Sequence, residues 1–264
     1  MKKTCSCKSL RLSPLRISCD LQAFLLTVQI EEKRGGILLF DDERAEDIGE
    51  GFSVIQSDSL FKFGTDAVLL AEFAKVKKGG SVLDFCTGSG IVPLLMYKNK
   101  KAEDFEALEI SEKAASMANR TMELNGISDK IRVTCGDVCR AREIYKGRQF
   151  DLVTCNPPYM NDGGGLKNPN ADKAAARHEI FCTLKDVVEN ASRLVRPGGF
   201  FAMVHRPHRL TDIMCLMREY SLEPKRLVLV SDSKKSEPSM VLIEGMKGAG
   251  HYLKTYTMFI KENL

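Results

Sequence analysis

Four residues that follow a short apolar segment could recognise a flat amine. Phe150–Cys155 is predicted to form a strand, and Asn156, Pro157, Pro158 and Tyr159 follow it directly. Prolines fix φ, donate no hydrogen bond and restrain the residue before them, so this turn is stiff. The Asn156 amide oxygen and the Pro157 carbonyl could each accept one hydrogen of an exocyclic NH2 group, and the Tyr159 ring could cover its flat face. The alternative is an ordinary proline-rich turn.

A second group of residues could bind a nucleoside that carries a positive charge. Asp84 ends the apolar segment Ser81–Phe85, and a turn with Gly88 and Gly90 then leads into a predicted helix. The glycines permit tight backbone and close approach of a ligand. A carboxylate at this strand end would repel a pyrophosphate and attract an ammonium. The pattern is neither the three-glycine dinucleotide fingerprint nor a phosphate loop with its lysine.

Further acidic residues recur where successive strands are predicted to end. Glu109 follows a second strand and could accept hydrogen bonds from ribose hydroxyls, and Asp137 follows a third and could meet an adenine amine. Upstream, Thr65 or Asp66 is a natural N-cap for an apolar helix, and this helix start could hold a carboxylate. The alternative there is simple capping.

The elements that must position these residues follow the spacing of βα units. Ligands bind open α/β sheets at the carboxyl ends of the strands, where these acids and the amide are expected to gather. We therefore predict a Rossmann-like α/β fold with a seven-stranded, mostly parallel sheet, helices on both faces and a small N-terminal β extension. Residues 35–76 are expected to form a hairpin and a helix on the core, and residues 77–264 the main domain.

Composition limits the remaining possibilities. The 264 residues carry a net charge of +4, which permits a nucleic-acid partner without requiring one. Residues 1–34 lack periodicity, and residues 2–16 hold five basic and no acidic side chains; we expect a leader without function. No apolar run reaches membrane-spanning length and no convincing export signal is found, so we expect reduced cysteines in the cytoplasm. The oligomeric state is not predicted, and a monomer is favoured. The pairs Cys135/Cys139 and His205/His208 lack a second ligand pair, and no metal site is predicted.

Together these motifs resemble a known family. Asp84–Gly90 with Glu109, Asp137 and Asn156–Tyr159 is similar to class I S-adenosylmethionine-dependent methyltransferases that act on amines. The segment Phe63–Leu70 brings the chain nearer to the bacterial adenine-N6 methyltransferases of valine tRNA, as do three later stretches: Ala176–Glu179, Arg196–Gly199 and Arg206–Leu210. The chain departs from the family at Phe85-Cys86 and in its leader.

The resemblance implies S-adenosylmethionine as cofactor and tRNA as substrate. It implies a catalytic turn of Asn156, Pro157, Pro158 and Tyr159, and substrate contacts by Arg177 and His178, which could instead form a local ion pair with Glu179. The implied cofactor site comprises Thr65, Asp66, Asp84, Phe85, Gly88, Gly90, Glu109, Ile110, Asp137, Val138 and Asn156. Open alternatives are a glutamine-N5 methyltransferase of release factors, a guanine-N2 methyltransferase of ribosomal RNA, and a catalytically silent RNA-binding module.

Overall fold

The computed structural model describes residues 33–34, 36–158 and 182–260. Three of the predicted site residues, Tyr159, Arg177 and His178, lie outside these ranges. Nearly all of the predicted leader, residues 1–34, also lies outside them.

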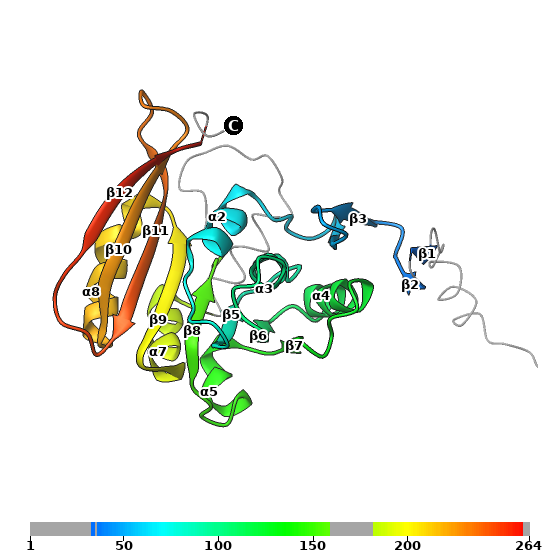
Figure 1. Cartoon of the computed structure of the whole chain (residues 1–264), viewed down its shortest axis with the longest axis horizontal. Coiled ribbons are helices and arrows are strands. Elements are labelled where there is room, and N and C mark those ends of the chain that lie inside the picture. Colours follow the sequence, from blue (N-terminus) through cyan, green and yellow to red (C-terminus); the bar gives the residue numbers. More distant parts are fainter. Residues whose placement is uncertain (1–32, 35, 159–181, 261–264) are drawn as a thin grey trace, which may run out of the picture.

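A single mixed sheet of eight strands organises the chain, one strand more than predicted (Figure 1). Its spatial order is β12-β10-β11-β9-β8-β5-β6-β7. Strands β9, β8, β5, β6 and β7 run parallel, whereas β11 is antiparallel to both of its neighbours and β12 extends the edge parallel to β10. The strands are β5 (Ser81–Phe85), β6 (Asp104–Glu109), β7 (Ile131–Cys135), β8 (Phe150–Cys155), β9 (Val195–His205), β10 (Leu222–Ser231), β11 (Pro238–Lys247) and β12 (Lys254–Phe259).

Helices cover both faces of this sheet, as predicted. One face is covered by α2 (Thr65–Phe73), α3 (Ile91–Lys98) and α4 (Glu112–Leu124). The other is covered by α5 (Ala141–Ile144), α7 (Leu184–Leu194) and α8 (Leu210–Glu219). Two 3-10 turns, η1 (Val138–Arg140) and η2 (Pro207–Arg209), complete the described helical elements.

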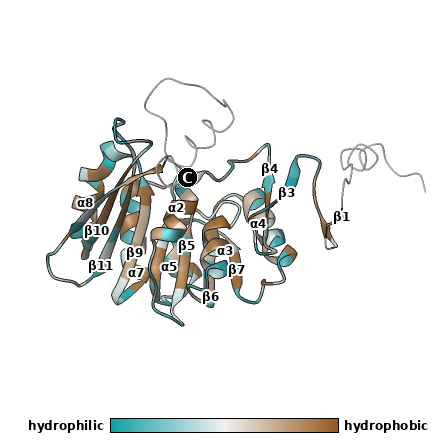
Figure 2. Cartoon of the chain, turned by 45° about the horizontal axis from the view of Figure 1, so that its top comes forward, coloured by the Kyte–Doolittle hydropathy of each residue, from teal (hydrophilic) through white to brown (hydrophobic). Residues whose placement is uncertain are grey.

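The strand alternation explains how the two layers form. Successive side chains of a strand point to opposite faces, so in β5 Val82 joins the α2–α4 layer and Leu83 the α5–α8 layer. Both side chains are fully buried. The hydropathy of the ribbon follows this arrangement, with hydrophobic strands inside and hydrophilic stretches on the helices (Figure 2). The sheet forms the frame of the molecule, and the site lies at the carboxyl ends of its parallel strands.

Before the sheet, the chain forms two small strand pairs, β1 (Lys33–Arg34) with β2 (Ile37–Leu38) and β3 (Glu43–Asp47) with β4 (Ser53–Ser57). Within residues 35–76 the hairpin is formed by β3 and β4, and β2 is only two residues long. The charged strand β3 was missed because its sequence lacks an apolar alternation. The hairpin is tied to α4, where Thr121 Oγ1 accepts a hydrogen bond from the Ile55 amide at 3.1 Å.

Side-chain caps mark the starts of two helices. Ser111 caps α4 and accepts a hydrogen bond from the Ala114 amide, and Thr183 and Asp186 form a reciprocal capping box at α7. The predicted cap of α2 is wrong, because Thr65 and Asp66 lie inside the first turn and Gly64 is the N-cap. Strand β9 begins at Val195, which pairs with Phe150 of β8.

Candidate active site

A cavity of about 550 Å³ opens at the carboxyl ends of β5, β6, β7 and β8. Most of the residues predicted for the cofactor and for the catalytic turn line it, namely Thr65, Asp66, Gly88, Glu109, Ile110, Asp137, Val138, Asn156, Pro157 and Pro158. Asp84, Phe85 and Gly90 do not line the cavity. Phe85 is buried in the α5–α8 layer, and Asp84 is only 1% exposed beneath the loop that follows β5. Their part in binding therefore stays a prediction.

The loop after β5 adopts backbone that favours glycine. Gly88 and Gly90 have φ of +57° and +78°, and Cys86 has φ of +56° although it carries a side chain. Left-handed backbone is costly for a side-chain-bearing residue, and such positions cluster at functional sites. At Gly90 a Cβ would lie 2.5 Å from Met122 Cε. The glycines therefore let the loop turn tightly and pack against α4.

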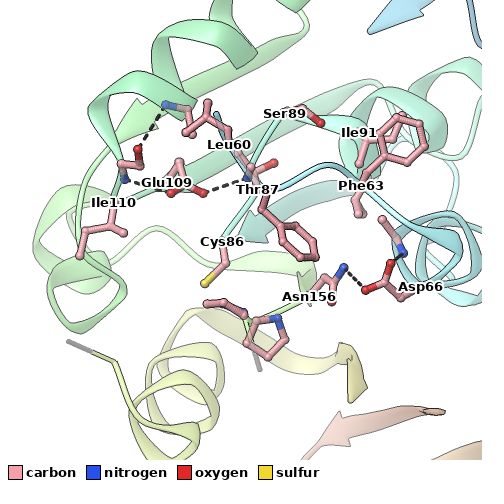
Figure 3. Close-up of a pocket in the computed structure, with 18 of the residues that line it drawn as sticks. Leu60, Phe63, Asp66, Cys86, Thr87, Ser89, Ile91, Glu109, Ile110 and Asn156 are labelled. Atoms are coloured by element: carbon pink, nitrogen blue, oxygen red, sulfur yellow. Dashed lines mark hydrogen bonds between the residues drawn. The ribbon is translucent and has the colours of Figure 1, made fainter. Parts of the chain in front are cut away.

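Glu109 ties this loop to the end of β6. Its two carboxylate oxygens accept hydrogen bonds from the Gly88 and Ser111 amides, each at 2.9 Å (Figure 3). The side chain is only 6% exposed, yet it lines the cavity. Because each carboxylate oxygen has two acceptor sites, Glu109 can hold the loop and still accept hydrogen bonds from hydroxyl groups of a ligand.

Asp84 carries a perturbed carboxyl group. Thr154 Oγ1 donates to Asp84 Oδ1 at 2.6 Å, whereas Asp84 Oδ2 is buried without a hydrogen-bond partner among the described residues. Burial raises the pKa of Asp84 to about 7; the Thr154 hydrogen bond opposes the rise, and the charge of Glu109 adds to it. A cation placed near this carboxyl group would favour its ionised form.

Asp137 lies beyond β7 at the start of η1. Its Oδ1 accepts a hydrogen bond from the Cys139 amide at 2.8 Å, which caps the 3-10 turn. The neighbouring Val138 is 5% exposed and presents an apolar surface to the cavity. An acceptor beside an apolar wall suits a flat base that carries an amino group.

On the opposite side, Asn156 is oriented by a residue 90 positions away in the sequence. Its Nδ2 donates to Asp66 Oδ2 at 3.1 Å, and both side chains line the cavity (Figure 3). Within the described part of the chain, nothing donates a hydrogen bond to the Asn156 oxygen. A Cβ at Gly64 would lie 2.8 Å from Asp66 Oδ1, so the glycine leaves room for this carboxylate. The hydrogen bond from Asn156 to Asp66 therefore leaves the amide oxygen of Asn156 as the acceptor at the cavity.

The charges around the cavity determine which ligands it can hold. Asp66, Glu109 and Asp137 line it and Asp84 lies behind it, whereas Arg206 is the lining residue with a permanent positive charge among those described. Carboxylates so placed favour a cation with hydroxyl and amino groups and disfavour a phosphate. The arrangement therefore fits an aminoacyl nucleoside cation.

Some lining residues were not predicted. Thr87 and Ser89 belong to the glycine-rich turn, and their positions within it could have indicated them. Phe63 was quoted only as part of a family motif. Cys182 and Met240 come from segments far along the chain, and no local pattern identifies them.

The chain has an α/β fold with a cavity at the carboxyl ends of its parallel strands, and solved structures share the fold. A predicted O-methyltransferase from Agrobacterium tumefaciens is 22% identical, with a TM-score of 0.59 over 74% of this chain and 86% of that chain. An O-methyltransferase from Thermotoga maritima is 14% identical, with a TM-score of 0.51 over 73% and 68% of the two chains.

The sequence profile of the methyltransferase small domain matches residues 53–219, and the chain belongs to that family. It is a methyltransferase that uses S-adenosylmethionine. Relatives named tRNA1(Val) (adenine(37)-N6)-methyltransferase include one from Porphyromonas gingivalis, 29% identical over 73% of this chain and 77% of its own length. Another, from Aeromonas salmonicida, is 28% identical over 73% and 79% of the two chains.

The residues around the cavity fit this cofactor. Ser89 lines the cavity, and its Oγ is a buried polar atom without a hydrogen-bond partner among the described residues; buried groups of this kind call for a partner. A ligand that brings an ammonium and hydroxyl groups would supply such partners.

Among the described helices, none has both the length and the apolar character needed to cross a bilayer.

Proposed function

We propose that the enzyme methylates the exocyclic N6 amine of an adenine in tRNA, namely position 37, beside the anticodon of valine tRNA. Two lines of evidence support this proposal. Relatives of similar length carry that activity in their names. The cavity also contains an asparagine whose amide nitrogen is engaged by Asp66, so that its oxygen is left to accept from an amine. The oriented Asn156 is the observation on which the proposal rests.

Asn156 and the Pro157 carbonyl would each accept one hydrogen of the target N6 amine. Two acceptors held rigidly around the nitrogen favour its change from flat, conjugated geometry to one in which its lone pair points at the methyl carbon. This stabilisation is realised only as the transition state is approached, so it lowers the barrier and not merely the dissociation constant. Tyr159, predicted to stack on the base, lies outside the described residues.

S-adenosylmethionine supplies a methyl group that is already activated on a positively charged sulfur. The protein therefore positions groups and excludes water, and it needs no strong general base. The residues of the turn would hold the amine in line with the donor, and the amine would accept the methyl group and release one proton to solvent, leaving S-adenosylhomocysteine.

We assign the cofactor contacts by chemistry. Glu109 would accept from the ribose hydroxyls, Asp137 from the adenine amine, and Asp84 with the Gly88–Gly90 turn would hold the methionine portion. Thr65 and Asp66, at the start of α2, border the same cavity. Ile110 and Val138 would contact the apolar surface of the adenosine.

The RNA would reach this cavity as an unstacked base. Single-stranded loops make base extrusion cheaper than a duplex does, and position 37 lies in such a loop. Arg177 and His178 remain candidates for RNA contacts, and Arg206 lies at the cavity itself. A tRNA substrate implies that the enzyme acts in the cytoplasm, and we keep the expectation of a monomer.

The proposal is tested by product analysis. Purified protein is incubated with methyl-labelled S-adenosylmethionine and either total tRNA or a release factor, and the products are digested for mass spectrometry. We expect label in N6-methyladenosine from tRNA. Label on a release-factor glutamine would agree with the proposed geometry of the turn, but it would show that adenine is not the methyl acceptor. Label on guanine N2 would also show that adenine N6 is not the acceptor.

A further inference from the structure

Three side chains with metal-binding atoms meet beside the cavity. The Sγ atoms of Cys139 and Cys182 and a carboxylate oxygen of Asp186 lie within 4.8 Å of one another. Cys139 belongs to η1, Cys182 precedes the N-cap of α7, and Asp186 lies in the first turn of α7. The sequence predicted no metal site because these residues come from two separate segments. The local spacing paired Cys139 with Cys135 and not with Cys182.

Hydrogen bonds fix the backbone at Cys139 and the side chain of Asp186. The Cys139 amide is bound by Asp137 Oδ1 at 2.8 Å, which fixes the start of η1. Asp186 Oδ2 accepts from the Thr183 amide and hydroxyl at 2.9 and 2.6 Å. Its second oxygen receives no hydrogen bond from any residue in the described ranges. The capping box therefore orients the carboxylate without using all of its acceptor sites.

The donor set selects the class of ion. Thiolates are soft ligands that favour Zn²⁺, and a carboxylate oxygen is also a common zinc ligand. Mg²⁺ and Ca²⁺ prefer sites made entirely of oxygen. Two sulfurs and one oxygen provide three of the four positions of a tetrahedral zinc site, and water can complete it. Asp137 adds a nearby negative charge that would help to balance the cation.

We propose that Cys139, Cys182 and Asp186 form a binding site for Zn²⁺. Binding would displace the two thiol protons and join η1 to the residue that precedes α7. Val138 and Cys182 both line the active-site cavity, so the ion would link two parts of its wall. The site does not depend on the identity of the methyl acceptor, and its test needs no activity measurement.

The test is metal binding to the untagged, reduced, full-length chain. Zn²⁺ is titrated against a chromophoric chelator, and Co²⁺ is used as a spectroscopic substitute. We expect the double variant Cys139→Ser/Cys182→Ser to bind one Zn²⁺ fewer per chain than the wild type. Asp186→Asn, which can still cap α7, should weaken zinc binding about tenfold. Co²⁺ should give a thiolate charge-transfer band in the wild type that the double variant lacks.

Cys215→Ser is the matched control, because Cys215 is an exposed cysteine on α8. It should leave the stoichiometry and affinity unchanged, and Mg²⁺ should not compete. Circular dichroism establishes that each variant is folded. Equal zinc stoichiometry in the wild type and the double variant would overturn the proposal, as would a Co²⁺ spectrum without thiolate ligation.

Discussion

The two halves of the cavity are held together in different ways. On the side of β6 and β7, carboxylates are fixed by main-chain amides: Glu109 accepts from Gly88 and Ser111, and Asp137 from Cys139. On the side of β8, Asn156 is oriented by one side-chain hydrogen bond of 3.1 Å to Asp66. The proposed cofactor half therefore belongs to the sheet and its loops, whereas the proposed acceptor half depends on a contact with α2. Changes in the two halves should consequently have different kinetic signatures.

The largest effect is expected for Asn156→Ala. Loss of the oriented acceptor should lower kcat about 100- to 1,000-fold, the magnitude known for removal of one preorganised polar group that acts in the transition state. The affinity for S-adenosylhomocysteine, measured by calorimetry, should stay within about threefold of wild type, because the other half of the cavity is intact. A large loss of nucleoside affinity would mean that Asn156 belongs to the cofactor half.

Glu109→Gln should produce the opposite signature. The amide cannot accept from both the Gly88 and Ser111 amides, and each hydrogen bond to a charged group contributes about 1.5–3 kcal/mol. S-adenosylhomocysteine affinity should therefore fall about 10- to 100-fold. The value of kcat at saturating donor should change much less. Equal losses in kcat and affinity would argue against two separable halves.

The pH dependence of binding should report Asp84. Its pKa is raised to about 7 by burial, and an ammonium beside it would favour the ionised form. S-adenosylhomocysteine affinity should thus increase about tenfold between about pH 6 and about pH 8. In Asp84→Asn this increase should be absent. A wild-type profile as flat as that of Asp84→Asn would show that the group does not face the ammonium.

The raised pKa of Asp84 also makes the stability of the folded protein depend on pH. Because the pKa is raised in the folded state, the folded protein holds the proton more tightly than the unfolded chain. The contribution of Asp84 to the free energy of unfolding is therefore fully present below about pH 4 and is lost as the pH rises through about 7. Asp84→Asn should remove this part of the pH dependence in urea titrations.

A smaller effect is expected at the contact that orients Asn156. In Gly64→Ala the new Cβ would lie 2.8 Å from Asp66 Oδ1 and push the carboxylate away. Asp66 then positions Asn156 less well, and kcat should fall about tenfold while the KM for the donor is nearly unchanged. Gly126→Ala is the matched control, since no atom lies within 4 Å of its Cβ position. It should affect stability and not kcat.

The smallest effect concerns the strained loop. Cys86 has φ of +56°, so Cys86→Gly should be more stable than Cys86→Ala by about 1 kcal/mol. Both variants remove the thiol, so the difference between their free energies of unfolding reports the cost of the left-handed backbone at this position. Thermal unfolding measures it. Equal stability would mean that the loop relaxes without cost.

Local patterns were sufficient to predict the parallel half of the fold and most of the residues that line the proposed cofactor half of the cavity. Strand ends with Asp84, Glu109 and Asp137 repeat at βα spacing, and the fold brings such ends to one edge. The charged strand β3 was missed because pairing and the contact with α4, not alternation, hold it. Asp66 was predicted as a helix cap, whereas its carboxylate contacts Asn156. Tertiary packing alone brings Cys182 to the cavity and close to Cys139, and no local sequence pattern predicts such a contact.

The central claim is that the oriented asparagine directs a methyl group to one adenine amine. It is tested most directly with two transcripts of valine tRNA that differ only in whether adenine or guanine stands at position 37. With labelled S-adenosylmethionine, the account predicts N6-methyladenosine in the adenine transcript and none in the guanine transcript. Equal labelling of the two transcripts, or label only on protein glutamine, would contradict it.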